Sequence, residues 1–349
     1  MNKQSRQRRG SAGYTAARCA PRARIPNQPS PHQPITRTTM PPKYDVLVLG
    51  EVCVDIILSG DVTPAFGQVE KVLDDAVLTA GSSSAIFACG AARLGLHVAF
   101  AGMVGDDVFG RFMLDALAQR GVDTSGVVVN PALKTGLTVH LIRGADRAML
   151  THMGAMEVFG LADFDMGMLA HARHLHVGSY FLQKALRPDV ARLFSAAQQQ
   201  GLTTSLDTGY DPDEVWGADV HATLAATNVF LPNATEALAL TGARDVGQAL
   251  ADLAARVPVV AIKMGAEGAR ARTGDDEAVA PALPVRIVDT TGAGDSFDAG
   301  FVYGFLQEWP LADTLALASA CGSLSTQGAG GTDAQPTLAA ARAALASLQ

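Results

Sequence analysis

The sequence predicts an α/β protein with a doubly wound, mostly parallel sheet that carries helices on both faces. From Tyr44 onward, short apolar runs alternate with longer helix-like stretches, which is the pattern of parallel strands joined by crossover helices. The chain has 349 residues, of which 48% are hydrophobic, so it is long enough to bury a substantial core. We therefore expect the ligand site outside the carboxyl ends of the strands.

The first half of this pattern follows from apolar runs and from the glycines that end them. Residues 44–50 form a short apolar run ending in glycine, which predicts a buried first strand. The segments around 54–79 and 135–152 are expected to leave the main sheet and to form a small β lid, with a hairpin turn at 144–146. The other elements predicted here are a helix over 84–95, a strand over 97–102, a helix over 107–120, and strands over 135–143 and 147–152.

The same alternation predicts the second half of the chain. Residues 269–288 differ from the rest, because they contain only short strand-like pieces that are expected to pair antiparallel. The predicted parallel strands lie over 173–178, 203–207, 228–231 and 258–263, and the helices that close the chain lie over 293–307, 311–327 and 336–348.

The charges divide the chain into a basic tail and an acidic body. Residues 1–43 contain lysines and arginines but no acid, although the whole chain has a formal net charge of -7. We expect the tail to be disordered, and residues 44–349 to form the folded domain. An acidic body argues against nucleic-acid binding, which needs clustered positive charge. No apolar run is long enough to predict a membrane span.

Neither the cysteines nor the histidines predict a metal site. The four cysteines are widely scattered, which favours a reduced, cytoplasmic protein. His171, His174 and His176 are close in sequence, and alternation along a strand would turn His174 and His176 to one face. No acid or cysteine completes a ligand set, so we expect a surface or core-edge role for these histidines.

A Gly-rich turn is predicted at a strand-to-helix junction. Residues 289–300 read DTTGAGDSFDAG, and the segment 285–289 that leads into them is strand-like. Gly292 and Gly294 lack a Cβ atom, so the backbone can bend sharply there and a ligand can approach its N–H groups closely. The residues that predict one buried face of the following helix are Phe297, Phe301 and Phe305, at a spacing of four.

The start of that helix makes the turn a candidate anion site. Asp295 is expected in the first helical turn, beside the place where a phosphoryl group could be held. A carboxylate there can accept the proton of an attacking hydroxyl, while backbone donors stabilise charge on the phosphoryl oxygens. Alternatively, Asp295 only stabilises the helix end, since acidic residues favour first turns for electrostatic reasons. From the turn alone both interpretations stay open.

The string from Asp289 to Phe297 resembles the C-terminal signature of ribokinase-like (PfkB) carbohydrate kinases. The resemblance covers nearly everything from Tyr44 onward, and it implies a ribokinase-like fold and ATP-dependent phosphorylation of a hydroxyl group of a sugar or sugar-like molecule. A nucleoside or phosphosugar acceptor stays open, as does a non-catalytic sensor of nucleotide or sugar. Further segments that match the family in the expected order are ARLG at 92–95, GMVGDDVFG at 102–110, NATE at 233–236 and KMGAEG at 263–268.

The resemblance also assigns the catalytic and nucleotide-side residues. It implies that Asp295 is the general base and that the backbone of Gly292, Ala293 and Gly294 forms the anion hole. The expected small-molecule partners are ATP and the acceptor, with a homodimer as an option. The residues that the resemblance implies for ATP binding are Asn233, Lys263, Gly265, Gly268 and Thr291.

Two cations are expected beside the nucleotide. Asn233 and Glu236 suit Mg²⁺ held through water, because magnesium keeps several waters and uses few protein ligands. On their own, these two residues equally fit a helix cap. Asp289 and Thr291, together with the loop 326–332, correspond to the region that binds a potassium-like ion in some relatives.

On the substrate side the sequence departs from the family. Many relatives carry Gly-Gly followed by an Asn that reaches the sugar, but residues 81–86 read GSSSAI, and the side chain of Ile86 forms no hydrogen bond. The serines either replace the polar contacts or cap the following helix. Basic side chains for a phosphosugar would come from Arg143, Arg147, Lys184 or Arg187. The substrate residues implied by the resemblance are Asp55, Gly81, Ser82, Gln183 and Asp207.

Overall fold

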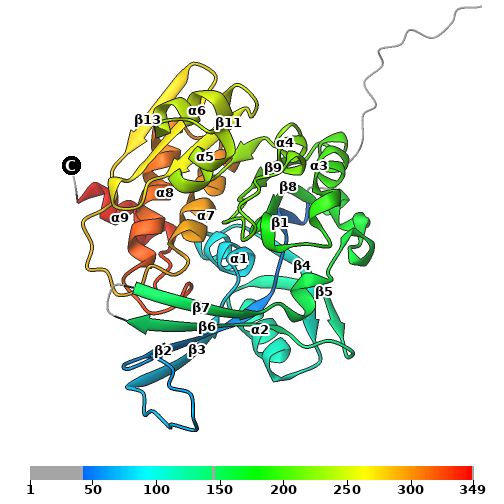
Figure 1. Ribbon diagram of the computed structural model, residues 1–349. Helices are drawn as coiled ribbons and strands as arrows, with labels where there is room; N and C mark the ends of the chain where they lie inside the picture. The colour runs from blue at the N-terminus through cyan, green and yellow to red at the C-terminus, as the bar shows by residue number, and fades with distance from the viewer. Residues whose placement is uncertain (1–41, 144–145, 348–349) are drawn as a thin grey trace, which may run out of the picture. The chain divides into compact units, whose positions relative to one another are not determined.

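The computed structural model describes residues 42–143 and 146–347, and its main element is a nine-stranded sheet (Figure 1). The strand order is β13-β12-β11-β10-β9-β8-β1-β4-β5, and neighbouring strands are parallel from β11 to β5. The last two strands, β12 and β13, pair antiparallel at one edge. The bounds are β1 (Tyr44–Leu49), β4 (Val98–Gly105), β5 (Val122–Asn130), β8 (Ala172–Val177), β9 (Thr203–Leu206), β10 (Val229–Phe230), β11 (Val259–Lys263), β12 (Ala269–Thr273) and β13 (Asp276–Ala280).

Helices cover both faces of this sheet, which confirms the doubly wound prediction. Successive side chains of β1 point to opposite faces. Val46 and Val48 pack in one hydrophobic core, and Leu47 and Leu49 pack in the other. The helices of the first core are α1 (Ser83–Leu94), α2 (Val108–Gln119), α7 (Ala293–Leu306), α8 (Leu311–Ser325) and α9 (Leu338–Ala346), and those of the second are α3 (Val190–Gln199), α4 (Ala218–Leu224), α5 (Ala234–Thr241) and α6 (Val246–Ala254).

A separate four-stranded sheet, called here the small sheet, has the order β3-β2-β6-β7 (Figure 1). Strands β2 and β6 are parallel, and the outer pairs are antiparallel. The register places Asp55 opposite both Thr79 and Thr138, so these polar side chains share one face. The bounds are β2 (Cys53–Ser59), β3 (Asp75–Ala80), β6 (Gly136–Arg143) and β7 (Asp146–His152).

Short polar residues and glycines set the helix ends. The Asp107 side chain accepts a hydrogen bond from the Gly110 N–H at 2.8 Å at the start of α2. Helix α1 ends at Gly95, whose φ of 106° is left-handed and therefore favours glycine. Both helices agree with the ranges that the sequence predicts. The helices predicted from residue 293 onward are also confirmed, with ends that differ by at most two residues.

The predicted strand over 285–289 is wrong. Strand β13 ends at Ala280, and the chain then runs as irregular backbone to the Gly-rich turn. Its backbone groups bond to the end of α8 instead of to a strand: the N–H groups of Val288 and Asp289 donate to the Thr326 carbonyl at 2.8 and 3.1 Å. Two prolines at 281 and 284 also lack the N–H that a ladder needs. The turn is therefore entered from a coil.

Strand β5 was not predicted from the sequence. Its first half is polar and contains Gly126, whose Cβ, if present, would lie 2.9 Å from the sulfur atom of Met168. His174 and His176 do share a face, since each has a ring nitrogen 2.7 Å from the Ser205 hydroxyl. The expected surface or core-edge role is wrong for these two, because both are buried and His176 stacks on Phe87, whereas His171 is exposed as expected.

Some expectations lie outside the described residues. These are the disordered tail up to residue 41 and most of the hairpin turn at 144–146, of which residues 144 and 145 are not described. Within the described ranges, none of the helices has the length and apolar character needed to cross a membrane. Cys53, Cys89 and Cys321 are buried free thiols.

Candidate active site

The Gly-rich turn lies directly before α7, and Asp295 lies in the first turn of that helix as expected. Gly292 has a φ of 72°, and a Cβ there would lie 2.7 Å from the Cα atom of Gly331, so glycine is required on both counts. The first N–H groups of a helix lack partners within the helix. The Ala293 N–H donates to the Thr290 carbonyl at 3.3 Å. This amide of the predicted anion hole therefore already forms a long hydrogen bond within the turn.

The environment of Asp295 favours its protonated form. Burial, followed by the negative charge of Asp207, raises the pKa of Asp295 to about 7. The Lys263 ammonium opposes this rise, Glu51 adds to it, and a hydrogen bond from Ser83 also lowers the pKa. A carboxyl group with a pKa near neutrality is suited to take up and release a proton at physiological pH.

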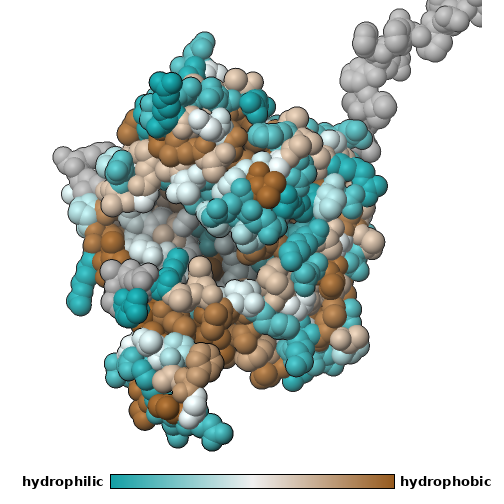
Figure 2. All heavy atoms as spheres, in the orientation of Figure 1, coloured by the Kyte–Doolittle hydropathy of each residue, from teal (hydrophilic) through white to brown (hydrophobic). Residues whose placement is uncertain are grey.

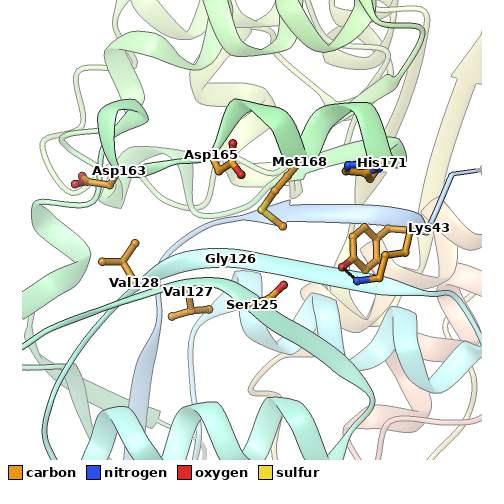
Figure 3. Close-up of a pocket in the computed structure, with 10 residues that line it drawn as sticks. Lys43, Ser125, Gly126, Val127, Val128, Asp163, Asp165, Met168 and His171 are labelled. Carbon is orange, nitrogen blue, oxygen red and sulfur yellow. Dashed lines mark hydrogen bonds between the residues drawn. The ribbon is translucent and has the colours of Figure 1, made fainter.

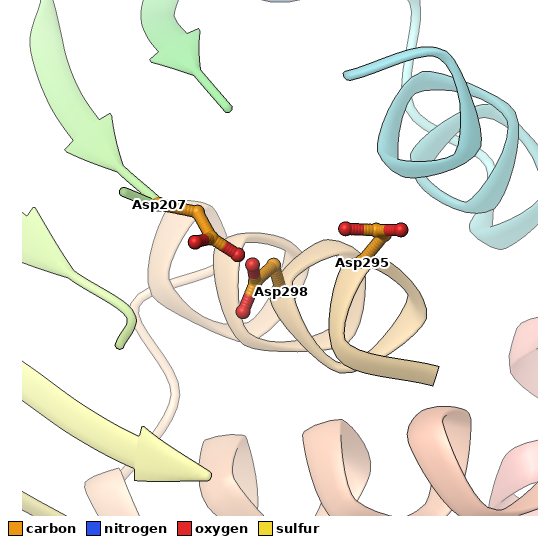
Figure 4. A group of neighbouring side chains, drawn as sticks. All are labelled: Asp207, Asp295 and Asp298. Atoms are coloured by element: carbon orange, nitrogen blue, oxygen red, sulfur yellow. The ribbon is translucent and has the colours of Figure 1, made fainter. Parts of the chain in front are cut away.

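Three carboxyl groups converge beside the turn: Asp207, Asp295 and Asp298 (Figure 4). Their ligand atoms lie within 4.8 Å of one another, a spacing that would suit a metal ion. An ammonium group already provides positive charge there, because Lys263 Nζ lies 2.8 Å from Asp207 Oδ2 and 3.0 Å from both oxygens of Asp298. The cluster is therefore a charge network of this chain and needs no ion to hold it.

Two acids of this region were missed from the sequence. Asp298 lies three residues after Asp295 on the same helix, so the helical spacing was a signal that both face one site. Glu51, directly after β1 and Gly50, is buried, and it accepts hydrogen bonds from the N–H and the hydroxyl of Ser84 at the start of α1. Burial raises the pKa of Glu51. Its position at the carboxyl end of the first predicted strand could have identified Glu51 as a candidate site residue.

A largely apolar cavity of about 440 Å³ adjoins the turn. Lys263, Gly265 and Gly268 line it, as expected for the nucleotide side, and so does Gly294. Gly268 has a φ of 87°, and a Cβ there would lie 2.1 Å from the Ala280 carbonyl oxygen, which explains the glycine. The irregular segment after β13 supplies apolar walls. They are Ala282, Leu283, Pro284, Val285 and Ile287.

Asn233 and Glu236 form the helix cap that the sequence left as an alternative. The Asn233 side-chain oxygen accepts from the Glu236 N–H at 2.9 Å, and the Asn233 N–H donates to the Glu236 carboxylate at 2.9 Å. Burial, then the charge of Asp207, raises the pKa of Glu236 to about 7. Asn233 also bridges to the backbone of Lys263, which brings the cap beside the charge network.

Asp55 lies within β2 of the small sheet and not in a turn after the first strand. Its side chain is buried, and the Asp55 Oδ2 atom lies 3.3 Å from His140 Nε2. A Cβ on Gly81 would lie 2.2 Å from Asp55 Oδ1, so Gly81 provides the space that this carboxylate occupies. His140 is also buried, and neither ring nitrogen has a hydrogen-bond partner among the described residues. His140 was missed, although its alternation with Thr138 along the predicted strand over 135–143 was visible.

The other predicted substrate residues are engaged within the protein. The Ser82 hydroxyl caps α1, accepting from the Ala85 N–H at 3.0 Å, so the capping alternative is present. The Gln183 amide is buried and donates to the Gly178 carbonyl. Asp207 accepts from Lys263 and from the Gly209 N–H, so it belongs to the charge network.

An arginine of the small sheet contacts the turn. The Arg147 guanidinium on β7 donates to the Thr291 hydroxyl at 3.0 Å. Thr291 in turn donates its hydroxyl and its N–H to Asp289 Oδ1 at 2.8 and 2.9 Å, and Asp289 Oδ2 accepts from the Gly330 N–H at 2.9 Å. Burial alone would raise the pKa of Asp289, but the hydrogen bonds from the N–H groups of Thr291 and Gly330 outweigh it. The pKa of Asp289 is therefore lowered. The turn, the loop 326–332 and the small sheet are therefore linked.

The four basic residues predicted for a phosphosugar site differ in their partners and positions. Lys184 pairs with Glu157 on the surface at 3.1 Å, and Arg187 pairs with Asp219. Arg143 and Arg147 line a small cavity of about 160 Å³ on the small sheet. Arg147 also contacts the Gly-rich turn. The space-filling view shows the surface hollowed where the small sheet meets the rest of the domain (Figure 2).

A second cavity, of about 420 Å³, lies toward the amino ends of the strands (Figure 3). Its acids serve local structure: Asp163 accepts from the Gly160 N–H and Asp165 from the Gly167 N–H. Lys43 pairs with Asp123 at 3.1 Å. This position is opposite to the edge at which doubly wound sheets bind ligands, so the candidate site is the carboxyl edge.

Comparison with known proteins identifies the family. Residues 43–338 match the family model of the pfkB family carbohydrate kinases. The chain belongs to this family. An ATP-dependent ribose-1-phosphate kinase of Halopiger xanaduensis is 32% identical over 304 residues, which cover 86% of this chain and 97% of the relative. A 5-dehydro-2-deoxygluconokinase of Geobacillus kaustophilus is 29% identical, with 84% and 91% covered.

Solved structures confirm the ribokinase-like fold of this pfkB kinase. A putative ribokinase II of E. coli in complex with ATP and Mg²⁺ matches with a TM-score of 0.79 and 24% identity, covering 87% of this chain and 99% of that chain. A ribokinase of Arabidopsis thaliana with ribose and ATP matches with a TM-score of 0.76 and 24% identity, covering 88% and 99%. The protein is an ATP-dependent carbohydrate kinase, as the sequence predicted.

Proposed function

We propose that this kinase transfers the γ-phosphoryl group of ATP to a sugar hydroxyl with Asp295 as the general base. The observation that carries the proposal is the position of Asp295 in the first turn of α7, directly after the Gly-rich turn, with its pKa raised to about 7. As the new P–O bond forms, the hydroxyl proton passes to the Asp295 carboxylate, and the bond between the γ-phosphorus and the bridging oxygen breaks to release ADP. The amides of Gly292, Ala293 and Gly294 would stabilise the charge on the phosphoryl oxygens.

The nucleotide is proposed to occupy the 440 Å³ cavity that Lys263, Gly265 and Gly268 line. Its apolar wall suits a purine ring, and its contact with Gly294 brings it to the helix end where phosphates are favoured. Thr291 lies in the same turn. These features support ATP as the donor.

Mg²⁺ is proposed to lie near Asn233 and Glu236 and to be held through water. The donor set fits, because each Glu236 oxygen accepts a bond from Asn233 and keeps a further lone pair for a water molecule. When bound, Mg²⁺ neutralises charge that develops on the phosphates. We further propose a monovalent cation, K⁺, at Asp289, Thr291 and the loop 326–332, a region that Asp289 already ties together.

The acceptor is proposed to be an anionic sugar, that is, a sugar phosphate or a sugar acid. Asp55 would bind its hydroxyl groups, with Gly81 providing space, and Ser82, Gln183 and Asp207 would take supporting positions around it. The support for a negative group is Arg147, whose guanidinium reaches the Gly-rich turn. The relatives named above act on a sugar phosphate and a keto-deoxy sugar acid. The negative group of the acceptor would therefore be either a phosphate or a carboxylate.

The general base is tested with Asp295→Asn. We expect kcat for ADP release to fall by roughly 10²- to 10⁴-fold, the range that a positioned base contributes. Binding of ATP-Mg²⁺, measured by calorimetry, should change by less than about threefold, since RT ln 3 is under 1 kcal/mol. A variant that turned over at nearly the wild-type rate would remove Asp295 from this role.

The acceptor class is tested with Arg147→Met on a panel of acceptors. The panel contains D-ribose and D-fructose as neutral sugars, and ribose 1-phosphate, 2-dehydro-3-deoxygluconate and 5-dehydro-2-deoxygluconate as anionic ones. We expect KM to rise by about 10- to 100-fold for anionic acceptors, the worth of a hydrogen bond to a charged group. Arg192→Met, on the exposed face of α3, is the control. Equal losses for neutral and anionic acceptors would contradict an anionic substrate.

A homodimer in a reducing compartment completes the proposal. Leu78 and Leu150 are exposed on the small sheet, where an apolar surface supports contact with a second copy. Light scattering at micromolar concentration measures the oligomeric state, and a monomer throughout would contradict the dimer.

The buried free thiols at 53, 89 and 321 support a reducing compartment.

A further inference from the structure

We propose that Lys263, Asp207 and Asp298 form a buried positioning triad that controls when Asp295 accepts the substrate proton. This inference rests on the proposed role of Asp295 as the general base. It assigns Lys263 a task beyond the nucleotide side, and it assigns Asp207 a task beyond the acceptor side. The three residues are positioning residues, because they act through Asp295.

The triad is assembled from three elements that meet at the carboxyl edge of the main sheet. Asp207 follows β9, Lys263 ends β11, and Asp298 lies one helical turn after Asp295 in α7. The ammonium lies 2.8 Å from Asp207 and 3.0 Å from both Asp298 oxygens. Asp207 and Asp298 are 7% and 1% exposed, so water screens these charges poorly.

Two carboxyl groups share one ammonium, so one of them is expected to keep its proton. Burial works against the charged form of Lys263, but the negative charges of Asp207 and Asp298 outweigh it and raise the pKa of Lys263. The pKa of Asp207 falls to about 2 against its burial, chiefly through Lys263. Burial raises the pKa of Asp298 well above its ordinary value. The triad is then close to neutral, with Lys263 and Asp207 charged and Asp298 protonated.

A neutral triad leaves Asp295 as a base of useful strength. The ammonium is held by Asp207 and Asp298, so it does not draw Asp295 into an ion pair that would keep it permanently ionised and weaken it as a base. Without the ammonium, the charge of Asp207 would instead keep Asp295 protonated. The other groups facing Asp295 are Glu51 at the end of β1 and the Ser83 hydroxyl on α1. The negative charge of Asp295 also raises the pKa of Glu236 on α5.

The test is the pH dependence of kcat, measured by ADP release with saturating ATP between pH 5 and 9. The acceptor is the one of the five named above that gives the highest rate. Wild type should lose activity as pH falls through about 7, because the base becomes protonated. In Lys263→Met this midpoint should move to higher pH by at least about half a unit, since a nearby positive charge is lost.

The variant with Asp207→Asn and Asp298→Asn together should move the midpoint in the opposite direction. The two amide oxygens still accept from the ammonium, so Lys263 keeps partners, but its charge now acts on Asp295 alone. The midpoint should fall by at least about half a unit. Arg270→Met, which breaks the surface pair with Glu277 at 2.7 Å, is the charge-loss control and should leave the midpoint in place.

The outcomes separate this inference from the proposed function. If Asp295→Asn keeps the acid limb, the general base itself is misassigned. If Asp295→Asn loses the limb, but the double variant keeps the wild-type midpoint, the triad is structural only and the inference is wrong. Should Lys263→Met fail to fold because Asp207 is left unpaired, the folded double variant still decides, since its midpoint must fall.

Discussion

The two walls of the candidate site are built in different ways. The wall at the start of α7 takes its groups from ten consecutive residues, from Asp289 to Asp298, and the Gly-rich turn and the first turn of the helix place them. The wall on the small sheet takes Asp55 from β2, and it takes His140 and Arg147 from the consecutive strands β6 and β7, which lie far from β2 in sequence. The first wall depends on local backbone conformation, and the second depends on strand register.

This difference indicates a division of labour. The proposed base and the anion hole lie on the helix wall, so changes there should act on kcat. The carboxylate proposed to bind sugar hydroxyls lies on the sheet wall, so changes there should act on the KM for the acceptor. The predictions below test whether the two effects separate.

Apart from the loss of turnover expected for Asp295→Asn, the largest effect is expected for Gly292→Ala. A methyl group there would lie 2.7 Å from Gly331 Cα and would force a residue with φ of 72° out of its conformation, which displaces the amides of the turn. We expect kcat to fall on the order of 100-fold, as for the loss of one oxyanion donor. Gly160→Ala is the matched control, because its Cβ would meet the Ala185 oxygen at an ordinary 3.4 Å. A change in acceptor KM alone would break the proposed division.

Asp55→Asn should act on the other wall. The amide keeps the size of the side chain but loses its charge, so we expect the acceptor KM to rise by about 10- to 100-fold. The dissociation constant of ATP, measured by calorimetry, should stay constant. Asp75→Asn, an exposed acid on the neighbouring strand β3, is the control. If kcat fell and KM did not change, Asp55 would belong with the catalytic groups.

Gly81→Ala should weaken acceptor binding by a smaller factor. Its Cβ would lie 2.2 Å from Asp55 Oδ1, so the carboxylate must turn away or the strand must shift. We expect KM for the acceptor to rise by roughly tenfold, about 1.4 kcal/mol. Combining this change with Asp55→Asn should add little, because both remove the same contact. Full additivity would show that Gly81 acts elsewhere.

The smallest effect is a gain in stability in Asp295→Asn. The folded-state pKa of Asp295, raised to about 7 by burial, lies above its ordinary value, so the folded protein binds an extra proton between about pH 4 and 7 and loses stability as pH rises through that window. Removing the carboxylate should raise Tm by at least about 2 °C at pH 8. The gain should be smaller at pH 5. Calorimetry with Asp75→Asn as control measures both, and a lower Tm at pH 8 would contradict the raised pKa.

The helix wall was largely predictable because its information is local. Glycines at fixed spacing and phenylalanines at spacing four located the turn and the buried face of α7. The strand over 285–289 was wrongly predicted, since an apolar run does not reveal that its N–H groups will bond to the end of α8. Whether Asn233 and Glu236 also serve Mg²⁺ stays a prediction, because a helix cap and a water-mediated site use the same atoms.

The sheet wall was predictable only in outline. The segments that form the small sheet were found from their strand-like patterns, but the pairing of His140 with Asp55 depends on the register between β2 and β6. The charge network was missed for a similar reason. Asp207, Lys263 and Asp298 are separated by long stretches of chain, and only the meeting of β9, β11 and α7 brings both carboxylates within 3.0 Å of the Lys263 ammonium.

The hydrogen bond from Arg147 to Thr291 has a consequence for protein engineering. Exchanging the small sheet between pfkB kinases is an obvious route to a new acceptor preference, because that sheet is a separate module. In this chain the module is fastened to the Gly-rich turn by a side chain of its last strand. A transplanted sheet will therefore need a matching pair at positions 147 and 291, and chimeras without that pair should change their specificity and their turnover rate together.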